Sequence, residues 1–320
     1  MKNMVISSGI DQLIGNTPII NMEYLSNNKH NFIGKLEFFN PSGSVKDRTA
    51  IGLIYKAVES GRLKKGMTLV ESSSGNLGHS LAMLCAHMGY KLLCIMDPKT
   101  PKANIDLVRA FGGEVCIVTE TDEHGGYQKP RIEKARELAE ENEHILNLDQ
   151  YENPSSNEYH AATTGKEIFR QLDGNIDILV GAVSTGGSLC GTASYLKSQK
   201  PDIEIVAVEP LGSTIFGGKY KPFLQNGTGL SFTPGNFDNG LIDHKIRVSD
   251  QDAFMQVNRC AKDFGLLLGS SSGALIHAAI EVGNSFDTPK NIVMLLADGG
   301  IKYLSTIYNP TWLTENNIAI

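Results

Sequence analysis

Short β-branched runs alternate with helical patterns along most of this 320-residue chain, and this alternation limits the possible folds more than any other feature. Strand-like runs are expected at 67–70, 91–96, 115–118 and 145–148, with helical patterns at 77–88, 101–111 and 131–142 between them. After a break near 149–157 the theme returns with strands at 178–183, 203–208 and 292–296 and helices at 189–198, 251–264 and 274–282. Such alternation predicts right-handed βαβ units on largely parallel sheets. We therefore expect two open, twisted α/β domains with a cleft between them.

Composition and charge exclude several classes of function. The net charge is -6 and no basic tract offsets it, which argues against a nucleic-acid partner. No run of 18 apolar residues and no signal-peptide core occurs, so we expect no membrane association. The cysteines form no close pairs of the kind that bind zinc, and we expect no metal site but free thiols in a reducing cytoplasm. They are Cys85, Cys94, Cys116, Cys190 and Cys260.

The segment Asn40–Arg48 leads from a turn into a helical pattern that carries Lys46 in its first turn. Ser44 and Asp47 have the spacing of a capping box. A lysine at the positive end of a helix dipole ionises less readily, which favours a nucleophilic, Schiff-base role over a solvated surface charge. The apolar stripe expected to face the core is Ile51, Ile54, Tyr55 and Val58.

Three loops rich in glycine and hydroxyl groups are expected to connect a strand to a helix, where ligands bind in open α/β sheets. The loop 71–78 (Glu-Ser-Ser-Ser-Gly-Asn-Leu-Gly) suits a carboxylate. The loop 183–188 (Val-Ser-Thr-Gly-Gly-Ser) suits a monophosphate, since it lacks the third glycine of a dinucleotide site and the lysine of a P-loop. The loop 269–273 (Gly-Ser-Ser-Ser-Gly) would by itself be a capped turn.

Together with Lys46, these loops resemble the pyridoxal-phosphate enzymes of the cysteine synthase/cystathionine β-synthase type (fold type II, tryptophan synthase β-like). The resemblance extends from Ile14-Gly15-Asn16-Thr17-Pro18 to 298–303. It implies a pyridoxal 5'-phosphate cofactor in the cleft, an internal aldimine with Lys46, and transfer of the α-proton by the same lysine. Asn76 would bind the cofactor's 3-hydroxyl group. The 5′-phosphate would be held by Ser184, Thr185, Gly186, Gly187 and Ser188.

The resemblance also assigns the remaining contacts and the assembly. Ser271, or failing that Ser272, would face the pyridine nitrogen, and a neutral hydroxyl there favours β-elimination and replacement over transamination. The substrate α-carboxylate would contact Ser73, Ser74, Leu77 and Gln150. A smaller mobile domain at 40–150, a larger phosphate-binding domain of 1–39 with 151–320, and a homodimer are expected.

Three departures from the usual cysteine synthase pattern bear on the substrate: Leu77 in place of threonine, Tyr151 in place of phenylalanine, and Ser184 in place of glycine. Tyr151 and Ser184 add hydroxyl groups near the leaving group, which suits an anionic group such as phosphate. With these departures, the segments 122–127, 212–217 and 308–313 are similar to the N-(2-amino-2-carboxyethyl)-L-glutamate synthases of staphyloferrin-type siderophore assembly. That resemblance implies joining of O-phospho-L-serine to L-glutamate through an aminoacrylate.

Arg131, four residues after the segment 122–127, has two interpretations. Its guanidinium fork could grip the side-chain carboxylate of the acceptor, or it could be a surface arginine on a charged, solvent-facing helix. His124, His79 and His160 are interpreted as structural hydrogen-bonding residues.

Other functions remain open on the sequence. They are a cysteine synthase that uses O-acetylserine or O-phosphoserine, a cysteine β-lyase that releases hydrogen sulfide, and a catalytically silent regulatory protein that binds the cofactor.

Overall fold

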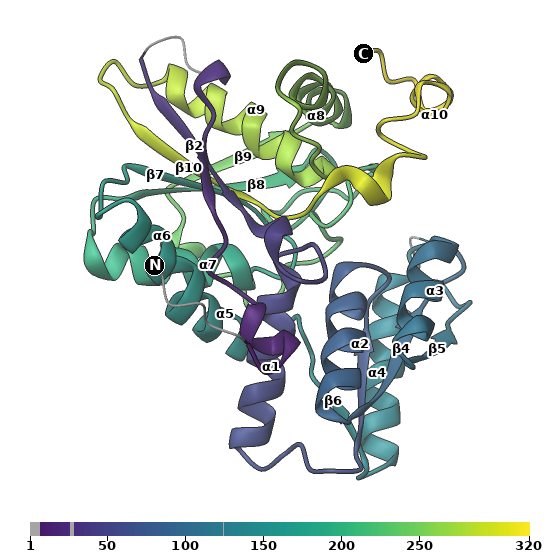
Figure 1. The fold of residues 1–320 in the computed structure, drawn as a ribbon. Coiled ribbons are helices and arrows are strands. Elements are labelled where there is room, and N and C mark those ends of the chain that lie inside the picture. Colours follow the sequence, from purple (N-terminus) through teal and green to yellow (C-terminus); the bar gives the residue numbers. More distant parts are fainter. Residues whose placement is uncertain (1–6, 26–28, 124) are drawn as a thin grey trace. The chain divides into compact units, whose positions relative to one another are not determined.

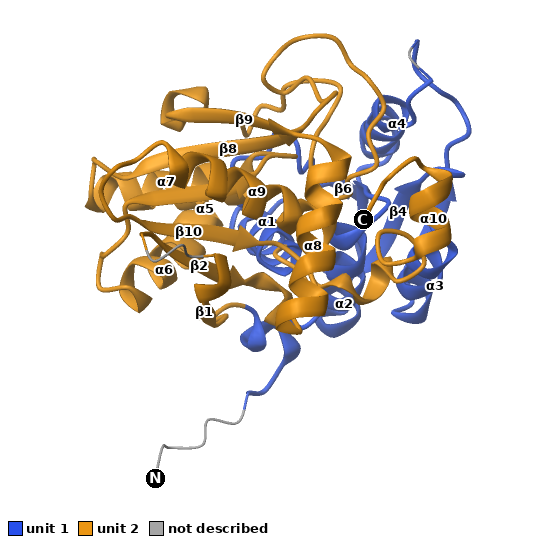
Figure 2. Ribbon diagram, turned by 90° about the horizontal axis from the view of Figure 1, so that it is seen from above, with its two compact units in different colours: residues 1–14, 40–42, 46–156 blue, residues 15–39, 43–45, 157–320 orange. Residues whose placement is uncertain are grey.

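The computed structural model describes residues 7–25, 29–123 and 125–320, and its contacts divide the chain into two compact units (Figures 1 and 2). Unit 1 consists of the described parts of Met1–Ile14, Asn40–Ser42 and Lys46–Ser156. Unit 2 consists of the described parts of Gly15–Phe39, Gly43–Val45 and Asn157–Ile320. Each unit contains one sheet, which confirms the α/β fold class. The domain boundaries at 40 and 150 stay a prediction.

Unit 1 is built on a parallel four-stranded sheet in the order β5-β4-β3-β6. Helix α4 covers one face of this sheet, and α2 and α3 cover the other (Figure 2). The strands are β3 (Thr68–Ser72), β4 (Lys91–Met96), β5 (Glu114–Ile117) and β6 (Ile145–Asn147). The helices are the 3₁₀ turn Ile10–Leu13, α1 (Lys46–Glu59), α2 (Asn76–Met88), α3 (Lys102–Ala110) and α4 (Gln128–Glu141).

The central strand β3 brings the candidate loops of unit 1 to one edge of its sheet. Ser72 is paired with Ile95 of β4, and Val70 is paired with Asn147 of β6. Because all of these strands are parallel, their carboxyl ends lie at the same edge. The segments that begin at Ser73, 97 and 148 therefore start side by side.

Unit 2 is built on a six-stranded sheet in the order β1-β2-β10-β7-β8-β9, in which only β1 is antiparallel. Helices α8 and α9 cover one face, and α5, α6 and α7 cover the other (Figure 1). The strands are β1 (Ile19–Asn21), β2 (Asn31–Leu36), β7 (Ile178–Ala182), β8 (Glu204–Pro210), β9 (His244–Val248) and β10 (Asn291–Leu296). The α-helices are α5 (Ser155–His160, which begins at the end of unit 1), α6 (Lys166–Gln171), α7 (Gly187–Gln199), α8 (Asp250–Phe264), α9 (Ser270–Asn284) and α10 (Pro310–Glu315). Shorter elements are the π-helical turn Ala161–Gly165 and the 3₁₀ turns Glu23–Leu25, Glu37–Phe39, Asn239–Leu241 and Gly300–Tyr303.

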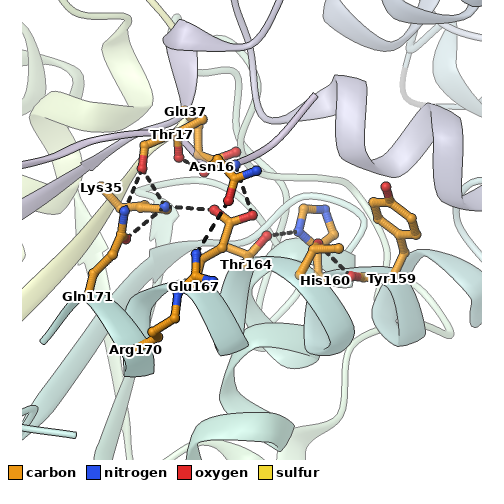
Figure 3. A network of polar contacts seen from close by, with 11 residues as sticks. Asn16, Thr17, Lys35, Glu37, Tyr159, His160, Thr164, Glu167, Arg170 and Gln171 are labelled. Carbon is orange, nitrogen blue, oxygen red and sulfur yellow. Dashed lines mark hydrogen bonds and ion pairs between the residues drawn. The ribbon is translucent and has the colours of Figure 1, made fainter. Parts of the chain in front are cut away.

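Strand β2 was not predicted from the sequence, because Gly34 and Lys35 interrupt its apolar run. Lys35 is nevertheless fully buried, and its ammonium group donates to the Thr17 carbonyl (2.7 Å), the Glu167 carboxylate (2.8 Å) and the Gln171 side chain (3.0 Å). Figure 3 shows these partners converging on the lysine. The network joins β2, α6 and the turn at Thr17, so a buried charge is fully hydrogen-bonded.

A second part of Figure 3 concerns His160, at the junction of α5 and the π-helical turn. Its Nδ1 lies 2.8 Å from the Thr164 hydroxyl oxygen, and the side chain is fully buried. The structural role predicted for this histidine is confirmed.

The stripe predicted for α1 is correct at its start and wrong at its end. Ile51 and Ile54 are buried, but Tyr55 and Val58 are 43% and 44% exposed. Ala57 is buried in their place. The Tyr55 hydroxyl donates to the Asp11 carboxylate at 3.0 Å, a contact with the N-terminal segment that no helical periodicity encodes.

Within the described ranges, no helix combines the length and apolar character needed to span a bilayer.

Candidate active site

Helix α1 begins at Lys46, and the residue after it joins three segments of unit 1. The Asp47 carboxylate accepts a hydrogen bond from the Ser42 backbone amide at 2.7 Å and from the Ser80 hydroxyl at 2.6 Å, and it also contacts the Ser42 hydroxyl. The carboxylate reaches back to Ser42, two residues before the Ser44 of the predicted capping box. Asp47 thereby fixes the helix end on which Lys46 stands.

The Lys46 amine is set for nucleophilic chemistry. Burial lowers the pKa of Lys46 to about 8, and the nearby Glu71 carboxyl group opposes that shift. The ordinary pKa of lysine is 10.5, so near pH 8 a large fraction of this amine is neutral. A neutral amine can attack an aldehyde or accept a proton.

The loop after β3 presents backbone amides at the start of α2. The Ser73 hydroxyl accepts from the amides of Gly75 (3.4 Å) and Gly78 (3.0 Å), which closes the turn. Asn76 opens the helix without a side-chain cap, and the first amides of a helix have no intrahelical partner. The Leu77 side chain is buried, so this residue can offer a ligand only its backbone. Amides at a helix start are compatible with a bound carboxylate, and carboxylate binding by this loop stays a prediction.

Gln150 and Tyr151 lie beyond the carboxyl end of β6, beside this loop. The Gln150 side chain donates to the Ser72 carbonyl at 2.8 Å, and its backbone amide donates to Glu71 at 3.1 Å. The buried Tyr151 hydroxyl accepts from the Gln128 side chain of α4 at 3.0 Å. Both predicted substrate residues are therefore held next to the loop of Ser73 and Ser74.

Arg131 is not on the surface, and the interpretation as a solvent-facing arginine is wrong. Its side chain is 8% exposed, and its Nη1 lies 3.2 Å from the Asp97 carboxylate beyond β4. Its positive charge opposes the rise in the pKa of Tyr151 that burial causes, so the two side chains are neighbours. Among the described residues, neither Nε nor Nη1 of Arg131 has a hydrogen-bond partner. His124, close by in sequence, lies outside the described residues.

Unit 2 places the second loop at the start of α7, which begins at Gly187. Gly186 has a positive φ of 89°, and a Cβ atom there would lie 2.7 Å from the Phe237 backbone nitrogen. Only glycine fits both constraints. The turn directs the backbone around Ser184–Ser188 into the N-terminus of a 13-residue helix, an arrangement that suits a phosphate.

The third loop does not follow a strand, so that part of the prediction is wrong. It follows α8 and reaches the carboxyl end of β10 through an isolated bridge between Leu268 and Gly299. The Gly269 amide donates to the Asp298 carbonyl at 3.0 Å. Ser271 and Ser272 then lie in the first turn of α9, and the Ser272 hydroxyl is buried with no hydrogen-bond partner in the part of the chain that the structure describes.

Two acidic residues of this region received no role from the sequence. Glu71 is a buried carboxyl group inside β3, and Asp97 directly follows β4. An acidic residue inside an apolar run such as Leu69-Val70-Glu71 is a usable signal, because an ionisable group is rarely buried without a reason.

All five cysteines are free, and four of them are buried. In the ranges described, no group of three or more His, Cys, Asp or Glu side chains is arranged to hold a metal ion.

The match to known families covers almost the whole chain: residues 10–298 fit the family described as "Pyridoxal-phosphate dependent enzyme". The chain belongs to this family of pyridoxal-phosphate dependent enzymes. It is 39% identical over 300 residues to a cysteine synthase of Staphylococcus aureus (strain Mu50 / ATCC 700699), covering 93% of this chain and 95% of the relative. It is 37% identical over 312 residues to the N-(2-amino-2-carboxyethyl)-L-glutamate synthase of Ralstonia nicotianae (strain ATCC BAA-1114 / GMI1000), covering 97% and 92%.

Solved structures agree with these relatives. The O-acetyl serine sulfhydrylase isoform 3 of Entamoeba histolytica superposes with a TM-score of 0.89 at 32% identity, covering 96% of this chain and 93% of that one. The fold type II class, the cofactor and the nature of the protein as a cysteine synthase-like enzyme are thereby confirmed.

The residues of each unit fit pyridoxal phosphate chemically. Unit 1 offers the Lys46 amine, whose pKa is lowered to about 8. Unit 2 offers the glycine turn at Gly186, which a Cβ atom would obstruct, and the unpartnered hydroxyl of Ser272. An amine can form a Schiff base with the cofactor's aldehyde, a turn at a helix start suits its phosphate, and a hydroxyl can hydrogen-bond to its ring nitrogen.

Proposed function

We propose that this enzyme joins O-phospho-L-serine to L-glutamate and forms N-(2-amino-2-carboxyethyl)-L-glutamate, a precursor of 2,3-diaminopropionate. The observation that carries this proposal is Arg131, a buried cation beside Tyr151 whose Nη1 is ion-paired with Asp97 and whose Nε lacks a hydrogen-bond partner among the described residues. A guanidinium with an unused donor suits the side-chain carboxylate of an acceptor, which glutamate has and sulfide lacks. The relative from Ralstonia nicotianae, similar over nearly the whole chain, supports the same choice.

The proposed cofactor contacts come from several segments of the chain. Lys46 would bind the aldehyde carbon, Asn76 the 3-hydroxyl group and Ser271 the pyridine nitrogen. The phosphate contacts are proposed for Ser184, Thr185, Gly186, Gly187 and Ser188. When bound, the cofactor withdraws electrons from the substrate α-carbon.

The remaining steps belong to residues of the chain. Ser73, Ser74, the Leu77 backbone and Gln150 hold the α-carboxylate of the donor. The α-amine of the donor displaces the Lys46 amine, which then accepts the α-proton. The C–O bond at the β-carbon breaks so that phosphate leaves with the bonding electrons. The α-amine of glutamate then forms the new bond at that carbon, and Lys46 returns the proton.

The hydroxyl groups of Tyr151 and Ser184 are proposed to favour the phosphate leaving group. Both replace residues without a hydroxyl in the usual cysteine synthase pattern. A dianionic leaving group requires more donors than acetate does, since each phosphate oxygen accepts hydrogen bonds.

A second candidate is a cysteine synthase that transfers sulfide to O-acetylserine or O-phosphoserine. The 39% identity to the Staphylococcus aureus cysteine synthase favours it. A β-lyase that releases hydrogen sulfide from cysteine is a third outcome of the same experiment.

The test offers O-phosphoserine, O-acetylserine or cysteine as donor, each with glutamate, sulfide or no acceptor, and identifies products by mass spectrometry. We expect phosphoserine alone to release phosphate and produce a new long-wavelength absorbance band, which glutamate then removes. Product with acetylserine and sulfide, but none with phosphoserine and glutamate, contradicts the proposal. Lys46→Ala is the control, and it should lose the visible absorbance of the bound cofactor.

The assembly and setting are proposed with the reaction: a homodimer in the cytoplasm that serves siderophore biosynthesis. Free, mostly buried thiols support a reducing compartment. Light scattering on the purified protein tests the dimer.

A further inference from the structure

Glu71 lies at the junction of the two loops that are proposed to hold the donor substrate. One of its oxygens accepts from the Ser72 amide at 2.8 Å, and the other accepts from the Gln150 amide at 3.1 Å. The Gln150 side chain returns a hydrogen bond to the Ser72 carbonyl at 2.8 Å. These contacts form a closed ring between the last two residues of β3 and the loop after β6.

Glu71 is also an electrostatic neighbour of Lys46. Burial raises the pKa of Glu71 to about 8, while the amides of Ser72 and Gln150 and the positive charge of Lys46 oppose that rise. The other titratable groups around Glu71 are Cys94 on β4 and Asp149 and Tyr151 beyond β6. Lys46 is the cation that acts on Glu71 itself, whereas Arg131 acts on Cys94 and Tyr151, and Arg136 is ion-paired with Asp149. The charge on each member of the pair therefore affects the protonation of the other.

We propose that Glu71 is a positioning residue of the active site, which ties the loop of Ser73 and Ser74 to that of Gln150 and Tyr151 and places an ionisable carboxyl group beside Lys46. The inference rests on the proposed function of Lys46 and of these loops, but not on the identity of donor or acceptor. Beyond the proposed reaction, Glu71 would link the geometry of the carboxylate-binding loops to the protonation of the Lys46 amine. Loss of the hydrogen-bonded ring would change the loop geometry and the Lys46 protonation together.

The test substitutes Glu71→Gln in the full-length chain freed of cofactor. Glutamine has nearly the same size but no charge, and its amide nitrogen cannot accept from a backbone N–H group. We expect the pKa of Lys46 to fall by about one unit, because the carboxylate that forms as Glu71 ionises, and that favours the protonated amine, is gone. The readout is the pH profile of Lys46 reductive methylation, measured on the peptide by mass spectrometry. Glu71→Asp keeps the charge and should shift the profile less, in the same direction.

Glu209→Gln is the matched control. Glu209 is a fully buried carboxylate that accepts from the backbone amides of Ile215 (3.0 Å) and Phe216 (3.4 Å) in unit 2. Its substitution should lower thermal stability and leave the Lys46 profile unchanged.

An unchanged Lys46 profile in Glu71→Gln, with only a loss of stability as in the control, overturns the proposal. If Glu71→Gln does not fold, the comparison of Glu71→Asp with the wild type decides it by the same criterion. Failure of the proposed reaction would appear in the donor and acceptor experiment and would leave this profile unaffected, so the two failures are distinguishable.

Discussion

At the scale of single residues, the protein places charged groups where water is scarce. Lys46, Glu71, Arg131 and Asp97 all belong to unit 1, and the last three are buried. Burial penalises the charged form of each such group unless a partner compensates. In this region, the buried charged side chains and the partners beside them are therefore the best indication of a functional site.

Arg131→Lys keeps the positive charge beside Asp97 but removes the planar fork. We expect the KM for glutamate to rise about tenfold to a hundredfold, the equivalent of one charged hydrogen bond of about 1.5–3 kcal/mol. Phosphate release from phosphoserine alone should stay close to the wild-type rate, because that half-reaction does not involve the acceptor.

The control for this variant is Arg136→Lys on the same helix, an exposed residue whose Nη2 lies 3.0 Å from the Asp149 carboxylate. Equal effects on glutamate in both variants would show that Arg131 does not contact the acceptor.

At the scale of elements, the alternating pattern predicted the core strands and most long helices within a few residues. The strand predicted at 91–96 has those same bounds in the structure. The missed elements depend on distant partners instead: β2 contains a lysine whose carboxylate partner is 132 residues away. Likewise, the sequence allowed Arg131 to be solvent-facing because its ion-pair partner is not on the same helix. That partner is Asp97, which follows β4.

The candidate site was predictable where it rests on local turn chemistry. The loops 71–78 and 183–188 were recognisable from glycine and hydroxyl content, and both open helices in the structure. The ring around Glu71 was not, because it requires the parallel register of β3 and β6, which no local pattern reveals.

Gly186→Ala tests the phosphate turn. The positive φ costs an alanine about 1–2 kcal/mol, and the contact with the Phe237 backbone adds to it. We expect a loss of more than about 2 kcal/mol in the free energy of unfolding, in urea without cofactor, and weaker binding of pyridoxal phosphate.

Gly217→Ala is the matched control, since Gly217 has a φ of 84° with nothing within 4 Å of the new Cβ. It should carry only the cost of the backbone conformation. Cofactor binding as strong in Gly186→Ala as in Gly217→Ala would rule out the proposed role of the turn.

Lys35→Met tests the buried network of β2 and α6. It leaves the Glu167 carboxylate without its cation, and removing one partner of a buried pair costs about 3–5 kcal/mol. The free energy of unfolding in urea measures the loss, and adding Glu167→Gln should recover part of it.

Lys197→Met removes an equally short ion pair, 2.8 Å to Asp243, that is partly exposed. We expect it to cost at most about 1 kcal/mol. Similar losses in the two variants would mean that burial of the Lys35 pair contributes little.

At the scale of the whole molecule, the buried acid and amine shape the pH dependence of stability. Between pH 4.5 and about 8 the native state keeps a proton on Glu71 that the unfolded chain releases, so this contribution falls as the pH rises. Between about 8 and 10.5 the unfolded chain keeps a proton on Lys46 that the native state has lost, so that contribution rises. The pair therefore stabilises the protein least near pH 8.

The contribution of Glu71 to the pH dependence of stability can be isolated by comparing the wild type with Glu71→Gln. The stability advantage of the wild type, from urea unfolding without cofactor, should shrink steadily from pH 5 to pH 8. A constant difference across this range would contradict a buried Glu71 that is protonated in the native state.

The main body of unit 1 is a single uninterrupted segment, Lys46–Ser156, and it contains Ser73, Ser74, Gln150, Tyr151 and Arg131. The proposed phosphate loop is encoded entirely outside that segment. We therefore expect acceptor preference to be exchangeable as one genetic cassette between members of the family, while the proposed phosphate loop, with Ser184, is inherited unchanged. A library of such chimeras would sort new amine and thiol acceptors while the proposed phosphate contacts stay the same in every member.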